Sequence, residues 1–238
     1  MTAAVKGTGA GARPRPDAAA ARALAAYDDL GWGDRFHVAV RWRSCPFPAV
    51  EARVPRAGRV LDVGCGHGLF ALYLAARAPD RAVVGVDVDA AKLVSARHAA
   101  ARAGLPVDFT EAVGGALPAG PWDAVTVVDV LYLLGPAAAL DLVARAAAAV
   151  APGGSLVVKE IDTRPRWKYQ LTRLQEVVAT RVTRITEGAG VAFVPPDDIA
   201  AAMTAAGLSV TRHPLGRRSV HPHLLLVGRR PLPGEGPA

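Results

Sequence analysis

Three glycines at alternating positions, Gly64, Gly66 and Gly68, follow a predicted buried strand in the segment RVLDVGCGHG (59–68). Glycine permits a sharp turn and lets a ligand lie against the main chain, because it has no Cβ. The first N–H groups of the helix predicted to follow have no partner within that helix and attract anionic groups. The spacing therefore predicts a nucleotide-binding turn.

Two acidic residues, Asp62 and Asp87, stand near the ends of two successive predicted strands. A carboxylate at the second place can accept hydrogen bonds from both hydroxyls of a ribose. Dinucleotide sites have a further glycine in G-x-G-x-x-G, where this chain has Leu69, so an NAD site is not indicated. A P-loop is excluded because no Gly-Lys-Ser/Thr follows.

Predicted strands and helices alternate through the chain, which is typical of a parallel sheet with helices on both faces. The strands are predicted at 59–63, 82–86, 107–110, 124–128 and 155–161, and the helices between them at 67–77, 89–103 and 137–150. After a helix at 199–207, strands at 209–214 and 221–228 predict a hairpin that closes the sheet, joined by a basic turn at 216–218.

Two segments lie outside this alternation. Residues 1–16 predict a disordered tail, and residues 17–57 predict a helical cap or lid that begins with Asp17 as an N-cap. The other segment is an insertion at 163–198. Apolar residues recur there at helical spacing, so we expect it to contain an amphipathic helix. The main domain is then residues 58–230. In the N-terminal segment, Pro46 and Pro48 are expected to interrupt regular structure.

The composition limits the class of protein. The chain has 238 residues, of which 51% are hydrophobic and 21% charged, which fits one globular domain. Its two cysteines cannot form a disulfide framework or a zinc site. No apolar run is long enough to span a membrane, and the first residues do not resemble a signal peptide, so we expect a cytoplasmic protein. A net charge of +7 is compatible with phosphate, acidic lipid or an anionic substrate.

Four motifs occur in an order known from one enzyme family: VLDVGCGHG, VVGVDVD, WDAVTVVDVLYLL and APGGSLVVKE. With them the chain resembles the class I S-adenosylmethionine (SAM)-dependent methyltransferases over residues 58–162 and 199–230. The resemblance implies an α/β, Rossmann-like fold: a seven-stranded, mostly parallel sheet whose last strand is antiparallel, flanked by helices, with an N-terminal helical cap and a helical insertion after strand five. It implies SAM as the cofactor and no metal.

The resemblance also implies the residues that bind the methionine part of SAM. Gly64, Gly66 and Gly68 would lie beneath it, and Asp62 would face its ammonium group. Cys65 belongs to the same turn; since a buried cysteine behaves as a small hydrophobic residue, we expect it to fill space rather than act as a nucleophile.

For the nucleoside part, the resemblance implies that Asp87 binds the ribose hydroxyls and Val88 packs on the adenine. Glu111 and Ala112 stand where relatives often have an acidic residue and an alanine that meet the adenine amino group. Asp129, at the end of strand four, would line the methionine side.

Two residues are candidates for the acceptor side. Tyr132, at the predicted start of a helix, has a hydroxyl that would orient an acceptor, with simple packing as the alternative. Glu160, next to Lys159 at the end of a buried strand, is a candidate general base or substrate ligand, with a salt bridge at an exposed strand end as the alternative. Leu133 occupies the place where many relatives have histidine, which rules out a histidine base there.

Several aromatic and histidine side chains allow two interpretations. In this family the segment before the first strand commonly folds over the cofactor, so Tyr27, Trp42 or Phe47 is expected either to contact it or to pack in the core. His67 either contacts the cofactor or occupies a variable exposed place. Three histidines in the hairpin lack acidic or cysteine partners and are expected at the surface rather than on a metal: His213, His221 and His223.

The expected function is methyl transfer from SAM to a small-molecule acceptor, at oxygen, nitrogen or carbon. A nucleic-acid substrate is not expected, because residues 129–132 read DVLY where amino-methylating enzymes have Asn/Asp-Pro-Pro-aromatic. The alternatives left open are a methyltransferase for RNA or another macromolecule, a non-catalytic SAM-binding protein, and an aminopropyl-transferring relative. The basic residues of 166–184 permit contact with a membrane surface, and no oligomeric state is predicted.

Overall fold

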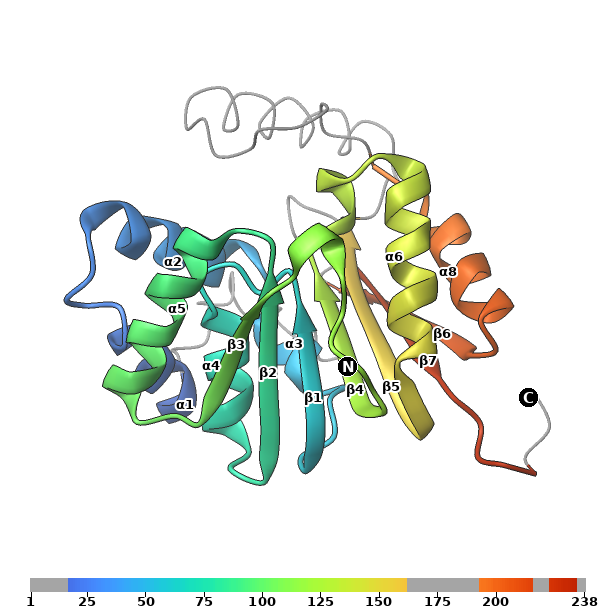
Figure 1. Ribbon diagram of the computed structural model, residues 1–238, viewed down its shortest axis with the longest axis horizontal. Coiled ribbons are helices and arrows are strands. Elements are labelled where there is room, and N and C mark those ends of the chain that lie inside the picture. Colours follow the sequence, from blue (N-terminus) through green and yellow to red (C-terminus); the bar gives the residue numbers. More distant parts are fainter. Residues whose placement is uncertain (1–16, 162–192, 216–222, 235–238) are drawn as a thin grey trace, which may run out of the picture.

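The computed structural model describes residues 17–161, 193–215 and 223–234 (Figure 1). A seven-stranded sheet of order β3-β2-β1-β4-β5-β7-β6 forms its centre. Strand β7 is antiparallel to both of its neighbours, and the other pairs are parallel, which confirms the predicted fold class. The strands are β1 Gly58–Val63, β2 Arg81–Asp87, β3 Val107–Glu111, β4 Trp122–Val128, β5 Val150–Ile161, β6 Ser209–Leu215 and β7 His223–Arg229.

Helices cover the two faces of the sheet (Figure 1). Because successive strand residues point to opposite faces, Val60 packs with the layer of α1, α4 and α5, whereas its neighbour Leu61 packs with the layer of α6 and α8. The helices are α1 Ala18–Ala25, α2 Trp32–Ser44, α3 Phe47–Glu51, α4 Leu69–Arg77, α5 Ala90–Ala103, α6 Pro136–Ala148 and α8 Pro196–Ala205, with single 3₁₀ turns η1 Val113–Gly115 and η2 Leu131–Leu133.

The N-terminal segment forms the predicted helices, with one correction. Asp17 caps α1, since its side chain accepts a hydrogen bond of 2.8 Å from the backbone N–H of Ala20. The expectation that two prolines interrupt regular structure holds for Pro46, which lies between the end of α2 and the start of α3, but was wrong for Pro48, which lies inside α3. Pro48 lies in the first turn of α3, where a missing N–H costs nothing.

Some predictions concern residues outside the described ranges. These are the tail 1–16, the basic turn 216–218, the basic residues of 166–184, and all of the insertion 163–198 except its last residues, where α8 already begins at Pro196. Within the described ranges, no helix is long and apolar enough to cross a membrane.

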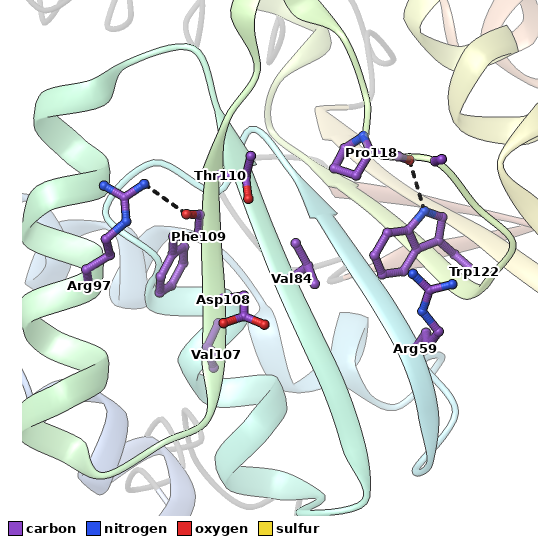
Figure 2. A pocket seen from close by; sticks show the side chains of 10 residues that line it. Arg59, Val84, Arg97, Val107, Asp108, Phe109, Thr110, Pro118 and Trp122 are labelled. Atoms are coloured by element: carbon purple, nitrogen blue, oxygen red, sulfur yellow. Dashed lines mark hydrogen bonds between the residues drawn. The ribbon is translucent and has the colours of Figure 1, made fainter.

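A groove of about 500 Å³ lies on the sheet near the short connection from β3 to β4 (Figure 2). Val107, Arg59 and Trp122, which line it, stand at or near the amino ends of their strands, and the Arg59 guanidinium lies 4.2 Å from the centre of the Trp122 ring. Ligands of open parallel sheets bind at the carboxyl ends of the strands. The functional site is therefore expected at the opposite, carboxyl end of the strands.

Candidate cofactor and active site

The three glycines of the turn after β1 all adopt left-handed backbone conformations, with φ of +70°, +55° and +80° for Gly64, Gly66 and Gly68. A Cβ at Gly64 would lie 2.4 Å from Cγ2 of Val130, and one at Gly68 would lie 2.6 Å from Cζ of Phe109. A Cβ at Gly66 would have no atom within 4 Å. Gly64 and Gly68 are thus required by packing within the protein, whereas Gly66 leaves open space against the main chain.

Asp87 holds this turn in place. Its Oδ2 accepts a 2.7 Å hydrogen bond from the N–H of Gly66, and its Oδ1 accepts a 2.9 Å bond from the N–H of Asp89. A carboxylate has about four acceptor positions, so Asp87 keeps the capacity to bind two hydroxyls. The side chain that the sequence predicts to bind ribose therefore also fastens the glycine turn to β2.

The residues predicted around the adenine lie together at the carboxyl ends of β2 and β3. Val88, next to Asp87, is 68% exposed although it is apolar. Glu111 pairs with Asp87 in the sheet and is exposed, and the N–H of Ala112 donates a 2.8 Å bond to the Asp87 carbonyl. The arrangement provides an apolar contact and a carboxylate beside Asp87.

Asp62 lies buried beneath the turn, in β1. Its carboxylate accepts a 2.7 Å hydrogen bond from the hydroxyl of Thr126, the residue opposite it in β4. Burial raises the pKa of Asp62 to about 7; the Thr126 hydroxyl opposes this shift and the charge of Asp87 adds to it. A buried carboxyl of this kind is stabilised in its charged form when a cation binds nearby.

The thiol of Cys65 is not a reactive group in this environment. Burial raises its pKa far above the usual value, and the carboxylates of Asp62 and Asp87 raise it further. Because nucleophilic cysteines need a thiolate, the geometry agrees with the interpretation of Cys65 as a residue that fills space.

A second cluster of buried charges lies at the ends of β4 and β5. Asp129 has a left-handed φ of +57° and accepts hydrogen bonds from Nζ of Lys159 and, at 2.9 Å, from Nη1 of Arg41. Burial alone would raise the pKa of Asp129, but the two cations outweigh it and hold this pKa well below its usual range. Three segments distant in sequence, α2, β4 and β5, therefore meet in one ionic contact.

Glu160 is buried on the other side of β5. Its Oε1 accepts hydrogen bonds from the N–H groups of Val130 (3.1 Å) and Leu131 (2.9 Å), so it shapes the connection from β4 to η2. Burial raises the pKa of Glu160 to about 8, and the charge of Asp129 contributes. The alternative of a salt bridge at an exposed strand end was wrong, because Glu160 is buried and Lys159 pairs with Asp129 instead.

Tyr132 lies in η2, a single 3₁₀ turn, and not at the start of the following helix, which begins only at Pro136. Its ring stacks on Phe193, with centres 5.6 Å apart and planes 19° apart. It is near enough to Arg41 for its hydroxyl to affect the pKa of that guanidinium.

The N-terminal cap contacts the glycine turn through His67. The Tyr27 hydroxyl donates a 2.6 Å hydrogen bond to the His67 carbonyl, Asp34 lies 3.3 Å from His67 Nε2, and the ring of His37 lies 4.6 Å from that of His67. Burial lowers the pKa of both histidines, that of His37 to about 4. His67 is thus a half-buried contact point for the cap rather than a variable exposed residue.

The other two aromatic candidates of the cap pack in the core. The Trp42 ring meets Tyr73 edge to face at 5.2 Å, and Phe47 stacks on Phe70 at 5.0 Å. In the hairpin, His213 lies within hydrogen-bond distance of Thr211. No group of potential metal ligands occurs within residues 17–161, 193–215 and 223–234.

Sequence reasoning missed Arg41. With 28 lysine and arginine residues in the chain, nothing in the sequence distinguishes this one. Only the packing of α2 against the ends of β4 and β5 selects it.

Comparisons with known proteins agree with this geometry. A family model described as a methyltransferase domain matches residues 60–154. A ubiquinone biosynthesis O-methyltransferase of Azotobacter vinelandii is 31% identical over 167 residues, which cover 68% of this chain and 69% of that protein. A trans-aconitate 2-methyltransferase of Methylobacterium nodulans is 36% identical over 135 residues, or 55% of this chain and 50% of that protein. This chain thus spans about half the length of the trans-aconitate relative.

Among solved structures, an O-methyltransferase family protein from Burkholderia thailandensis superposes with a TM-score of 0.66 at 23% identity, over 89% of this chain and 63% of that one. At this identity the likeness supports the fold alone. Together with the Azotobacter relative and the matched domain model, the motifs and the sheet order lead to one assignment: the chain belongs to the class I SAM-dependent methyltransferase family.

Proposed function

We propose that this protein binds SAM at the glycine turn between β1 and α4 and transfers its methyl group to a small-molecule acceptor. The observation that carries the proposal is the open space over Gly66, bordered by the Asp87 carboxylate and the exposed Val88. The full activity, the acceptor and the partners are part of the proposal.

The residues present fit the cofactor. Gly66 has a left-handed backbone and space where a Cβ would point, as required for a ligand that presses against the main chain. Nδ1 of the neighbouring His67 is buried and has no hydrogen-bond partner among the described residues, so a polar ligand group would satisfy it. Asp87 would hold the ribose, Val88, Glu111 and Ala112 the adenine, and Asp62 and Asp129 the methionine end.

When bound, SAM supplies a methyl group on a positively charged sulfur, which a nucleophile displaces. The protein must align the acceptor and, for a protonated acceptor, receive a proton. Tyr132 would orient the acceptor through its hydroxyl. Glu160, whose pKa of about 8 keeps it mostly protonated at neutral pH, would accept that proton only above this pH; at neutral pH it would hold the β4–η2 connection in place.

The names of these relatives support a small acceptor, since they refer to trans-aconitate and to ubiquinone biosynthesis. Residues 17–57 form the cap of this proposed site, because Tyr27, Asp34, His37 and Arg41 all contact it.

Thermal-shift titration with SAM, S-adenosylhomocysteine and NAD in parallel tests the cofactor. A ligand that binds only the folded state raises the unfolding midpoint. At a ligand concentration of a hundred times its Kd, the folded state gains about 2.7 kcal/mol of stability. We expect a shift with the first two ligands alone. A shift with NAD, or no shift with any of the three ligands, would contradict the proposal. Once a shift with SAM is found, labelled SAM and a panel of small carboxylic acids and phenols test the acceptor.

A further inference from the structure

The outer side of α2 exposes an apolar stripe, which we define as Trp32, Phe36 and Val40. The three residues recur every four positions, so they share one helix face. They are 81%, 58% and 45% exposed, and the rings of Trp32 and Phe36 stack 5.7 Å apart with planes at 13°. Only 5% of the chain is aromatic, so two adjacent aromatic rings in solvent form a conspicuous patch, and such patches commonly mark interaction surfaces.

The packing of α2 does not need this stripe. The helix is anchored by its inner face: Asp34 accepts a 2.6 Å bond from the Ser95 hydroxyl, Arg41 binds Asp129, and Val38 is buried. The stripe is therefore available to an outside partner while α2 stays in contact with the site.

Within α2 the exposed charges have one sign, whereas the exposed Asp28 and Asp29 precede the helix. Arg35 and Arg43 are exposed on α2, whereas the one acidic residue of this helix, Asp34, is turned inward onto Ser95 and His67. Aromatic and aliphatic side chains flanked by arginines are typical of helices that lie in the interface of an anionic bilayer. The chain as a whole also carries a net charge of +7, which attracts acidic lipid surfaces.

We propose that α2 docks this protein on an anionic lipid surface, with the stripe at headgroup depth and Arg35 and Arg43 on the lipid phosphates. A second copy of the chain fits less well. A helix of 13 residues is about 20 Å long, and three side chains are far fewer than the roughly 20–30 residues that each partner contributes to a stable protein interface. A lipid surface needs no shape complementarity.

Vesicle flotation with the full chain tests the proposal. Vesicles of phosphatidylcholine with phosphatidylglycerol are compared with vesicles of phosphatidylcholine alone, at low and high salt. We expect binding to the anionic vesicles only, and a loss of about tenfold or more in the double variant Trp32→Ser, Phe36→Ser. The double variant Arg35→Glu, Arg43→Glu should also lose this binding.

The matched control is Leu232→Ser, which removes an apolar side chain that is 49% exposed and lies beside Gly153, near the start of β5. It should bind vesicles as the wild type does, and all variants should keep the wild-type unfolding midpoint. Absence of vesicle binding by the wild type, or equal binding by the Trp32→Ser, Phe36→Ser variant, overturns the proposal. A concentration-dependent dimer that this variant loses would assign the stripe to a second copy and overturn it as well. None of these results bears on SAM binding.

Discussion

At the glycine turn between β1 and α4 the site is built from backbone groups, whereas at the ends of β4 and β5 it is built from buried charged side chains. Gly66 contributes space and an N–H group, and Asp87 receives that N–H. Asp129, in contrast, is surrounded by the ionic groups of Arg41 and Lys159. The first region depends on residues close in sequence, and the second depends on how three distant segments pack.

The difference predicts which substitutions should affect ligand binding and which should affect stability. At the glycine turn, the N–H of Gly66 is already bonded to Asp87, so what remains for a ligand is the space over Gly66 and the free acceptor positions of Asp87, which contribute little to folding. A buried ion pair is costly when one partner is removed, because the remaining charge is left without compensation. Substitutions in the first region should therefore affect ligand affinity most, and those in the second should affect stability most.

The largest expected effect follows from Asp129→Ala. This change leaves the buried Lys159 and the half-buried Arg41 without their carboxylate and places a non-glycine residue of poor left-handed preference at φ +57°. We expect the free energy of unfolding to fall by about 3–5 kcal/mol, measured by urea denaturation. Arg41→Ala, which leaves the Asp129–Lys159 pair intact, should cost less. Equal loss in both variants would show that the cluster does not act as described.

A large loss of SAM affinity is expected for Asp87→Ala, with a smaller loss of stability because the N–H groups of Gly66 and Asp89 lose their acceptor. Two charge-assisted hydrogen bonds to the ribose are lost, which corresponds to about 3 kcal/mol, or roughly a hundredfold in Kd. Calorimetric titration measures it, with Asp108→Ala, an exposed acidic residue in β3, as the control. Unchanged affinity in Asp87→Ala would make the motif assignment wrong.

The pH dependence of stability distinguishes Glu160 from Asp129. Folded Glu160 keeps its proton up to about pH 8, while the unfolded chain loses it near pH 4.5, so the folded state binds more protons in between. Stability therefore falls as pH rises through this window, by at most about 1.4 kcal/mol per pH unit. Asp129 has the opposite shift and loses its contribution only below its ordinary pKa, in acid.

Glu160→Gln keeps an acceptor for the N–H groups of Val130 and Leu131 but cannot ionise. Its stability should therefore vary less than that of the wild type between pH 5 and 8, as followed by thermal unfolding. Parallel curves for the two proteins would mean that Glu160 does not titrate in this window.

The smallest effect is expected for Tyr132→Phe. The ring stacking on Phe193 survives and only the hydroxyl is lost. If the hydroxyl orients the acceptor, kcat/KM should fall by up to about tenfold with an unchanged unfolding midpoint. A fall in stability without a change in kcat/KM would assign Tyr132 to packing alone.

The sequence by itself was sufficient for the strand and helix order and for the glycine turn between β1 and α4 with its partner Asp87. Hydrophobic periodicity determines which elements form, and the bond from Gly66 to Asp87 closes within one βαβ unit, whereas the side chains that crowd Gly64 and Gly68 are Val130 and Phe109, outside that unit.

Only the tertiary structure decided the second half of the site. Arg41 meets Asp129 across 88 positions, and Glu160 meets the N–H of Leu131 across 29, through the packing of α2 and β5 at the end of β4. The exposure of Trp32 and Phe36 likewise depends on which face of α2 turns inward. Ionic and packing contacts of this kind depend on position in space and leave no spacing in the chain, so no sequence pattern could have revealed them.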